Sequence, residues 1–201
     1  MPERKNSFRR IKILQSLAEI LEQNPGARIT TARIAQQVGV TEAALYRHFP
    51  SKAKMFEGLI EFIETTIFSR ITIILKEEKS AASRCQKIIY LLITFAELNP
   101  GITRILTGDP LTGESERLRG RVVQFFDRFE TQLKQVLRES ALSEDDQPRL
   151  DVQITANLML SVAEGRISQY VRSDFTRLPT TQWNEQWNIL QQTLFQKHGS
   201  D

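Results

Sequence analysis

The chain has 201 residues, with 27 Lys or Arg against 24 Asp or Glu and a formal net charge of +3. A hydrophobic fraction of 40% and a charged fraction of 25% are typical of a folded globular protein and exclude wholesale disorder. The single cysteine, Cys85, excludes an internal disulfide, and no run of residues approaches the ~18 apolar side chains of a membrane helix.

Apolar residues recur at three- and four-residue spacing along almost the whole chain, which predicts an all-α fold. A first helix is expected over residues 8–22, ended by the turn-forming residues 24–26. Its buried face is expected to hold Ile11, Leu14, Ala18 and Leu21.

Two short helices follow. Thr30 can cap the N-terminus of the first, which Gly39 ends, and Thr41 can cap the second. Pro50 ends the second helix near His48, because the residue before a proline is pushed out of the helical region.

Longer helices are expected over the rest of the chain. Their expected ranges are 51–76, 81–98, a short piece over 102–108, a long helix ending near 140, 150–171 and 182–195. Residues 109–114 are expected to form a loop and residues 143–148 a linker. The apolar stripe of the helix over 51–76 is expected to hold Phe56, Leu59, Ile60, Phe62, Ile63, Ile67, Ile71 and Ile74.

The charge is concentrated at the N-terminus. Nine Lys or Arg and four carboxylates lie within residues 1–52, a net charge of +5, while the rest of the chain carries −2. A basic segment on a near-neutral scaffold favours a polyanion-binding function, although a solvated basic face would look the same.

Residues 29–50 have the pattern of a helix-turn-helix. Gly39 supplies the turn, small Ala35 lets the two helices approach closely, and Leu45 faces inward. The second helix of such a motif enters the major groove of DNA. Its outward face holds Thr41, Glu42, Ala43, Tyr46 and Arg47.

Flanking groups can contact phosphates, which position a protein on DNA but carry little sequence information. The free backbone amides at the start of the helix that Thr30 caps favour an anion. Lys52 lies at the start of the helix expected over 51–76, where its ammonium group can meet a phosphate. The candidate DNA-binding residues are Arg9, Arg10, Thr30, Thr31, Arg33, Thr41, Glu42, Ala43, Tyr46, Arg47, His48 and Lys52. Alternatively, Tyr46 and His48 only pack the end of a helix hairpin.

The stretch Leu45-Tyr46-Arg47-His48-Phe49, followed by Lys52, resembles the DNA-binding domain of the TetR family. The resemblance implies an all-helical, two-part chain: a helix-turn-helix domain over 1–52 and a dimerisation and partner-binding domain over 53–201. It also implies a homodimer formed through the last two long helices, often with a ligand pocket.

Further blocks, at 59–64, 99–101, 103–108, 135–139 and 171–173, resemble the nucleoid occlusion factors within that family. That resemblance implies binding to palindromic chromosomal sites, with several dimers per site possible, and binding to the C-terminal tail of the division protein FtsZ. The protein would then oppose assembly of the division ring over the nucleoid.

The tail-binding groove that the resemblance implies would be lined by Phe62, Arg70, Leu91 and Asn99, which offer an apolar floor and a cation. Phe62 and Leu91 could instead be core residues. Thr94 and Leu98 depart from the glycine and basic residue expected there.

Enzyme signatures are absent: the sequence has no glycine-rich phosphate loop and no His or Cys cluster with metal spacing. We therefore expect no catalytic activity, cofactor, metal or membrane partner. Because no signal peptide is evident, a cytoplasmic, nucleoid-associated protein is expected. The alternative function is an ordinary ligand-responsive transcriptional repressor.

Overall fold

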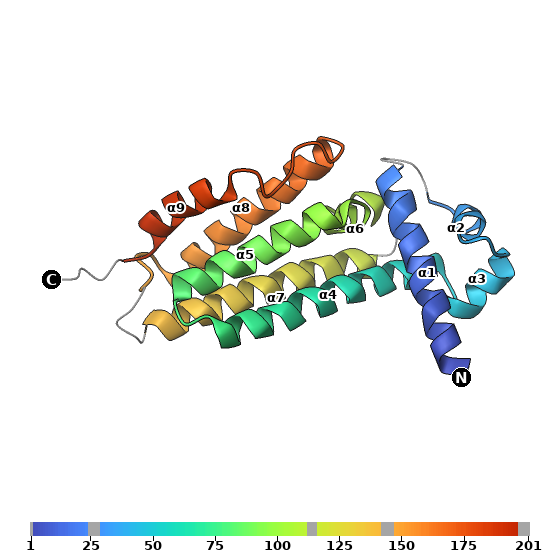
Figure 1. Ribbon diagram of the computed structural model, residues 1–201, viewed down its shortest axis with the longest axis horizontal. Coiled ribbons are helices and arrows are strands. Elements are labelled where there is room, and N and C mark those ends of the chain that lie inside the picture. Colours follow the sequence, from blue (N-terminus) through green and yellow to red (C-terminus); the bar gives the residue numbers. More distant parts are fainter. Residues whose placement is uncertain (1, 24–28, 112–115, 142–146, 197–201) are drawn as a thin grey trace. The chain divides into compact units, whose positions relative to one another are not determined.

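The computed structural model describes residues 2–23, 29–111, 116–141 and 147–196, with side chains from Arg9 onward. Within these ranges the chain is all-α, which confirms the predicted fold class, and its one strand-like feature is an isolated bridge between Pro148 and Phe195. The elements are α1 (Pro2–Gln23), α2 (Thr31–Val38), α3 (Glu42–His48), α4 (Lys52–Glu77), α5 (Ala81–Leu98), α6 (Pro100–Leu106), η1 (Asp109–Leu111), α7 (Glu116–Ala141), α8 (Val152–Arg172) and α9 (Trp183–Leu194) (Figure 1). No described helix is long and apolar enough to cross a membrane.

Most predicted helix ranges agree with the structure to within a few residues. The expected loop at 109–114 was wrong at its start, because residues 109–111 form a 3-10 turn closed by a hydrogen bond from Leu111 N to Gly108 O at 3.0 Å. The turn predicted at 24–26, the rest of that loop and most of the linker at 143–148 lie outside the described residues.

The chain divides into two compact units. The first unit comprises Met1–Glu64 and Asn99–Val123, and the second comprises Thr65–Leu98 and Gln124–Asp201. The first unit therefore contains the helix-turn-helix together with α6, which comes from much later in the sequence. The functional boundary expected at residues 52/53 stays a prediction.

In the first unit, α1 packs on α2, α3 and α6 (Figure 1). Its buried side chains are Ile13, Ser16, Leu17, Ile20 and Leu21. The predicted face was wrong in part: Ile11 is 52% exposed, and Leu14 and Ala18 are only half-buried. The apolar side chains of α1 lie on several sides of the helix. Their spacing alone therefore could not show which side the neighbouring helices cover.

The contact between α1 and α6 is unusually close. Gly101 lies so near the backbone of α1 that a Cβ there would overlap the carbonyl oxygen of Ala18 and lie 2.9 Å from Glu22 N. One turn later, Arg104 is 2% exposed and donates a hydrogen bond to Leu21 O at 2.6 Å. Its guanidinium also pairs with Asp109, with Nε 2.9 Å from Oδ2. The pairing compensates the burial of a charge that would otherwise be costly.

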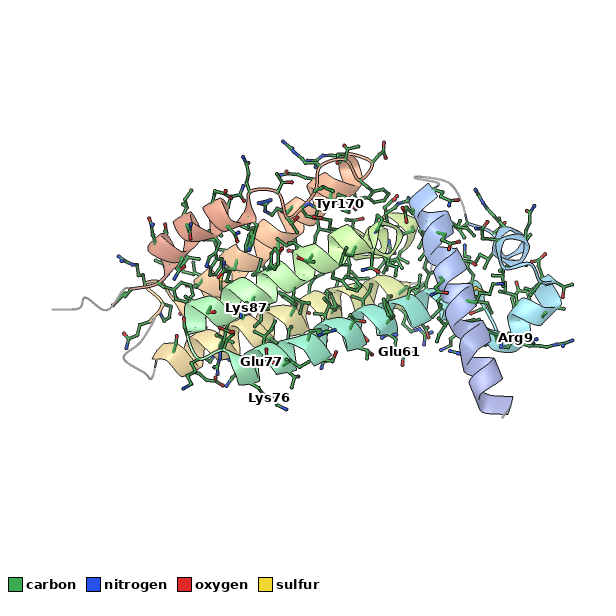
Figure 2. All side chains as sticks on the ribbon, viewed as in Figure 1. Arg9, Glu61, Lys76, Glu77, Lys87 and Tyr170 are labelled. Carbon is green, nitrogen blue, oxygen red and sulfur yellow. The ribbon has the colours of Figure 1, made fainter. Side chains whose placement is uncertain are left out.

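In the second unit, α5 packs along α8 and also contacts α9 (Figure 1). Tyr170 of α8, labelled in Figure 2, donates a hydrogen bond to Glu97 O at 3.1 Å. Two backbone hydrogen bonds join the segment before α8 to the residues around the end of α9, Arg149 N to Leu194 O at 2.8 Å and Gln196 N to Gln147 O at 2.9 Å. The two ends of the α8–α9 hairpin are thereby held together.

Glu164 of α8 has a pKa raised above its ordinary value of 4.5, first because it is partly buried and second because the Glu130 carboxylate of α7 repels its charge. Both causes disfavour the charged form of the Glu164 carboxyl in the folded protein.

We expect Gly101→Ala to destabilise the protein by roughly 1–3 kcal/mol or more, because the new methyl group meets fixed backbone and not a flexible side chain. Gly120→Ala is the matched control, since a Cβ at that position in α7 meets nothing within 4 Å. It should be neutral or stabilise by about 0.5–1 kcal/mol. Urea unfolding of both variants measures the difference, and equal midpoints would contradict the proposed contact.

We expect Glu164→Gln to raise the melting temperature at neutral pH. A carboxyl with a raised pKa loses stability as the pH rises through its folded-state pKa, so the gain from its removal is present above that pKa and disappears below the ordinary value of 4.5. Thermal unfolding between about pH 4 and pH 8 tests this. Glu185→Gln, at an exposed position of α9, is the control, and a gain that is constant with pH would count against the assignment.

Candidate nucleic-acid interface

The two helices of the predicted helix-turn-helix are capped as their sequence indicates. Thr30 Oγ1 accepts a hydrogen bond from Arg33 N at 3.3 Å, and Thr41 Oγ1 accepts one from Ala44 N at 3.2 Å. Between them Gly39 has a φ of 77°, a left-handed conformation that favours glycine. Thr30 sets where α2 begins, Gly39 where it ends, and Thr41 where α3 begins.

The outward face of α3 is the one predicted. Thr41, Glu42, Ala43, Tyr46 and Arg47 are all exposed, while Leu45 is completely buried. Ala44, beside Ala43, is half-buried. These two alanines place small side chains at the centre of the exposed surface of α3. A helix of this shape can approach the floor of a major groove closely.

Three of the candidate residues form a hydrogen-bonded chain that the sequence analysis did not anticipate. Tyr46 Oη donates to Thr31 Oγ1 at 3.3 Å, and Thr31 Oγ1 donates to Glu42 Oε2 at 2.7 Å. These two hydrogen bonds link the start of α2 to both the start and the last turn of α3. They therefore fix the orientation of α3 relative to α2 through side chains on the face expected to meet DNA.

Other candidate residues are engaged within the protein. Arg10 donates to His48 O at 2.7 Å, and its guanidinium lies 4.2 Å from the centre of the Phe49 ring. Lys52 Nζ donates to Ile29 O at 3.1 Å, which joins the start of α4 to the residue before the α2 cap. Arg10 therefore supports the C-terminal end of the motif and Lys52 its N-terminal end, and a direct role on DNA for them stays a prediction.

A groove of about 570 Å³ lies between α1 and the turn from α2 to α3. Arg9 and Lys12 line it from α1 (Figure 2 labels Arg9), and Val40 and His48 line it from the motif. Lys12 was not among the residues predicted to bind DNA, although its spacing of three residues from Arg9 places both on one face of a helix.

The charge at this surface is mainly unpaired and positive. Among the described residues, no carboxylate lies within 4 Å of the charged groups of Arg9, Lys12, Arg33 or Arg47. Unpaired cations beside an exposed helix can contact phosphates and make binding salt-dependent. The arrangement suits docking on DNA, and the individual contacts stay predictions.

The four residues expected to line a partner groove are distributed over both units. Phe62 of α4 and Asn99, next to α6, belong to the first unit, and Arg70 of α4 and Leu91 of α5 belong to the second. Phe62 is 45% exposed, so the expectation that it joins the buried stripe was wrong. Arg70 is exposed and Leu91 is half-buried. A common groove for all four stays a prediction.

Two family models match the chain. Residues 13–59 match the model described as bacterial regulatory proteins, tetR family. Residues 79–195 match the SlmA-like model described as tetracyclin repressor-like, C-terminal domain. The first match includes the whole of α2 and α3, and the second extends from just before α5 to the end of α9.

Curated relatives are similar over nearly their whole length. The nucleoid occlusion factor SlmA of Shewanella pealeana is 60% identical over 94% of this chain and 95% of its own. The protein of the same name from Alteromonas mediterranea is 59% identical over 96% of this chain and 98% of its own. The similarity thus includes both the helix-turn-helix and the helices that follow it.

Solved structures share the fold at low sequence identity. A TetR transcription regulator from Haloarcula marismortui aligns with a TM-score of 0.78 at 18% identity, over 94% of this chain and 100% of that one. The regulator FadR from Bacillus subtilis aligns with a TM-score of 0.73 at 18% identity, over 91% and 98%. At this identity the likeness concerns the fold alone.

We expect Lys12→Ala to weaken binding to all duplexes to a similar degree, because a phosphate contact carries no sequence information. The slope of log affinity against log salt concentration should become shallower by about 0.9, since one phosphate is no longer neutralised. Fluorescence anisotropy at several salt concentrations measures both quantities. Arg138→Ala, an exposed arginine of α7, is the control, and an unchanged slope for Lys12→Ala would exclude this groove from the interface.

Proposed function

Since the chain belongs to the family of TetR-type nucleoid occlusion factors named SlmA, we propose that it binds palindromic chromosomal sites as a homodimer and there binds the C-terminal tail of FtsZ. Assembly of the division ring over the nucleoid is opposed as a result. The names of its relatives denote a DNA-associated regulator and not an enzyme.

The observation that carries the proposal is the extent of the identity. At 60% over 94% of the chain, it includes the helices beyond the DNA-binding motif, where a shared helix-turn-helix alone would not require it. Structural neighbours at 13–18% identity support only the fold.

Binding to a palindrome follows from two-fold symmetry. Two copies of α3, one from each protomer, would enter successive major grooves on one side of the duplex, with half-sites ~34–36 Å apart. The exposed face of α3 and the unpaired cations of the groove beside α1 support this mode of docking.

A homodimer is supported by apolar side chains on the surface of the last two helices. Ile154 and Leu158 of α8 are 57% and 40% exposed and lie one turn apart, and Ile189 of α9 is 67% exposed. Burying them against a second copy removes apolar surface from water, which is the main driving force of stable association.

Binding of the FtsZ tail is supported by the chemistry of the candidate residues. Phe62 offers an exposed ring, and Arg70 offers a cation without a carboxylate within 4 Å among the described residues. An extended peptide with acidic and apolar side chains would be complementary to such a pair. Leu98, which replaces the expected basic residue, is 74% exposed and adds apolar surface.

A labelled peptide of the FtsZ tail tests the proposal by anisotropy, with the protein alone and with the protein on a duplex found by in vitro selection. We expect binding to the wild type on DNA and a loss of roughly tenfold in affinity for Arg70→Asp, because the reversed charge repels an acidic peptide. Arg138→Asp, also at an exposed position, should bind as the wild type does.

Retained DNA affinity distinguishes a lost peptide site from a misfolded protein. Arg70→Asp should bind the selected duplex as tightly as the wild type. If the wild type binds the duplex and ignores the tail peptide at every concentration tried, the FtsZ proposal fails, and an ordinary repressor is the better description.

A further inference from the structure

The end of α8 and its connection to α9 hold the last turn of α5 at one residue. The carboxylate of Glu97 accepts hydrogen bonds from Thr180, through Oγ1 and through the backbone N–H at 3.3 Å. The carbonyl oxygen of Glu97 accepts one from Tyr170 Oη at 3.1 Å. We call these three hydrogen bonds the Glu97 clip. They join residues 73 and 83 positions apart, all within the second unit.

The end of α5 needs such donors because the last carbonyl groups of a helix have no partner within the helix. α5 ends at Leu98, and α6 already begins at Pro100. Proline has no backbone N–H, so residue 100 cannot donate to the carbonyl group of Glu97. Tyr170, which is 3% exposed, supplies a donor from α8 (Figure 2).

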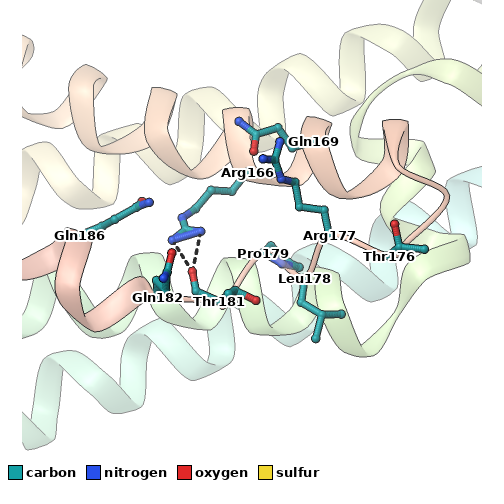
Figure 3. Close-up of a pocket in the computed structure, with 9 residues that line it drawn as sticks. All are labelled: Arg166, Gln169, Thr176, Arg177, Leu178, Pro179, Thr181, Gln182 and Gln186. Atoms are coloured by element: carbon teal, nitrogen blue, oxygen red, sulfur yellow. Dashed lines mark hydrogen bonds between the residues drawn. The ribbon is translucent and has the colours of Figure 1, made fainter.

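The donors of the clip are themselves held in place. Arg166 of α8 donates to Thr181 O from Nη1 and Nη2, at 3.2 and 2.9 Å, and so fastens the residue after Thr180 to α8 (Figure 3). Phe175 N donates to Tyr170 O at 2.9 Å, and the centres of these two rings lie 5.2 Å apart. The connection is therefore held on α8 near both of its ends.

Backbone strain accompanies the start of this connection. Asp174 and Phe175 have φ angles of 48° and 63°, a left-handed conformation that side chains disfavour. Such residues persist where the surrounding structure holds them, often at functional sites. Here the two residues end α8 and bring Phe175 back against Tyr170, so the strain supports one donor of the clip.

The clip lies beside side chains that face the candidate tail-binding groove. Leu91, Thr94 and Leu98 follow one another at spacings of three and four residues and therefore share one face of α5. Glu97 lies in the same last turn, on the adjoining face. Leu98 is 74% exposed, so its own contacts hold it only weakly. Its position therefore depends on the turn that carries it.

We propose that Glu97 is a positioning residue for binding of the FtsZ tail: the clip keeps the last turn of α5 folded while the outer face of that turn meets the peptide. The inference rests on the proposed function and adds a residue that does not touch the peptide. Helix ends fray, and a surface that is ordered before binding loses less conformational entropy when its partner arrives. Without the clip, this ordering cost falls on the binding step.

Thr180 gives the sharpest test, because its hydroxyl group can be removed at nearly constant side-chain size. Thr180→Val lacks the Oγ1 donor, and Thr180→Ser keeps it. Thr131→Val is the matched control, since Thr131 is exposed and its Oγ1 donates to Asp127 O within α7 at 2.8 Å.

A labelled peptide of the FtsZ tail, measured by anisotropy with the protein on the selected duplex, reports the effect. We expect Thr180→Val to bind it about threefold to tenfold more weakly, a part of the effect of a hydrogen bond to a charged group. Thr180→Ser and Thr131→Val should bind as the wild type does. Glu97→Gln, which keeps the shape but not the charge of the acceptor, should bind more weakly by a smaller factor and replaces Thr180→Val if that variant does not fold.

Amide hydrogen exchange shows separately whether the clip orders α5. Exchange at residues 94–98 should become faster in Thr180→Val, while its affinity for the duplex stays that of the wild type. Equal peptide affinities of Thr180→Val and the wild type overturn the proposal even if exchange becomes faster, because the clip is then structural alone. An equal loss in Thr131→Val overturns it as well. A wild type that binds the duplex and ignores the peptide instead refutes the proposed function, and this inference with it.

Discussion

The close approach of α6 to α1 is the constraint on which the DNA-binding unit depends. Because Gly101 lies against the backbone of α1, the two helices are in contact without intervening side chains. Arg104 then reaches the carbonyl group of Leu21 and reinforces the contact with a buried charge. Since α1 also packs on α2 and α3, it links α6 to both helices of the motif.

The motif itself is held by short-range interactions. The caps at Thr30 and Thr41 and the left-handed Gly39 define the two helices, and the chain from Tyr46 through Thr31 to Glu42 sets the orientation of one relative to the other. Tyr46 and Glu42 thus orient α3 and are also exposed on the face expected to meet DNA. A duplex that engages Tyr46 or Glu42 would compete with the hydrogen bonds that orient α3, which couples recognition to the geometry of the motif.

Local signals predicted the local structure well. The caps, the turn at Gly39 and the bounds of α5 follow from neighbouring residues, and the structure agrees with each of them. These local signals could not predict interactions between residues that are distant in the sequence. Spacing could not decide that Ile11 and Phe62 are exposed, because both lie on helices with more apolar side chains than their neighbours cover. The positive φ angles of Asp174, Phe175 and Gln182, around the connection from α8 to α9, likewise follow from no sequence motif.

The inclusion of α6 in the first unit has a consequence for synthesis on the ribosome. Residues 65–98 are translated between the two parts of that unit. At about 5–20 residues per second, this takes ~2–7 s. During that time the face of α1 around Ala18 and Leu21 has no α6 to cover it. The nascent helix-turn-helix therefore waits for a later segment before its first helix is fully packed, and its maturation on the ribosome is tied to elongation through α5.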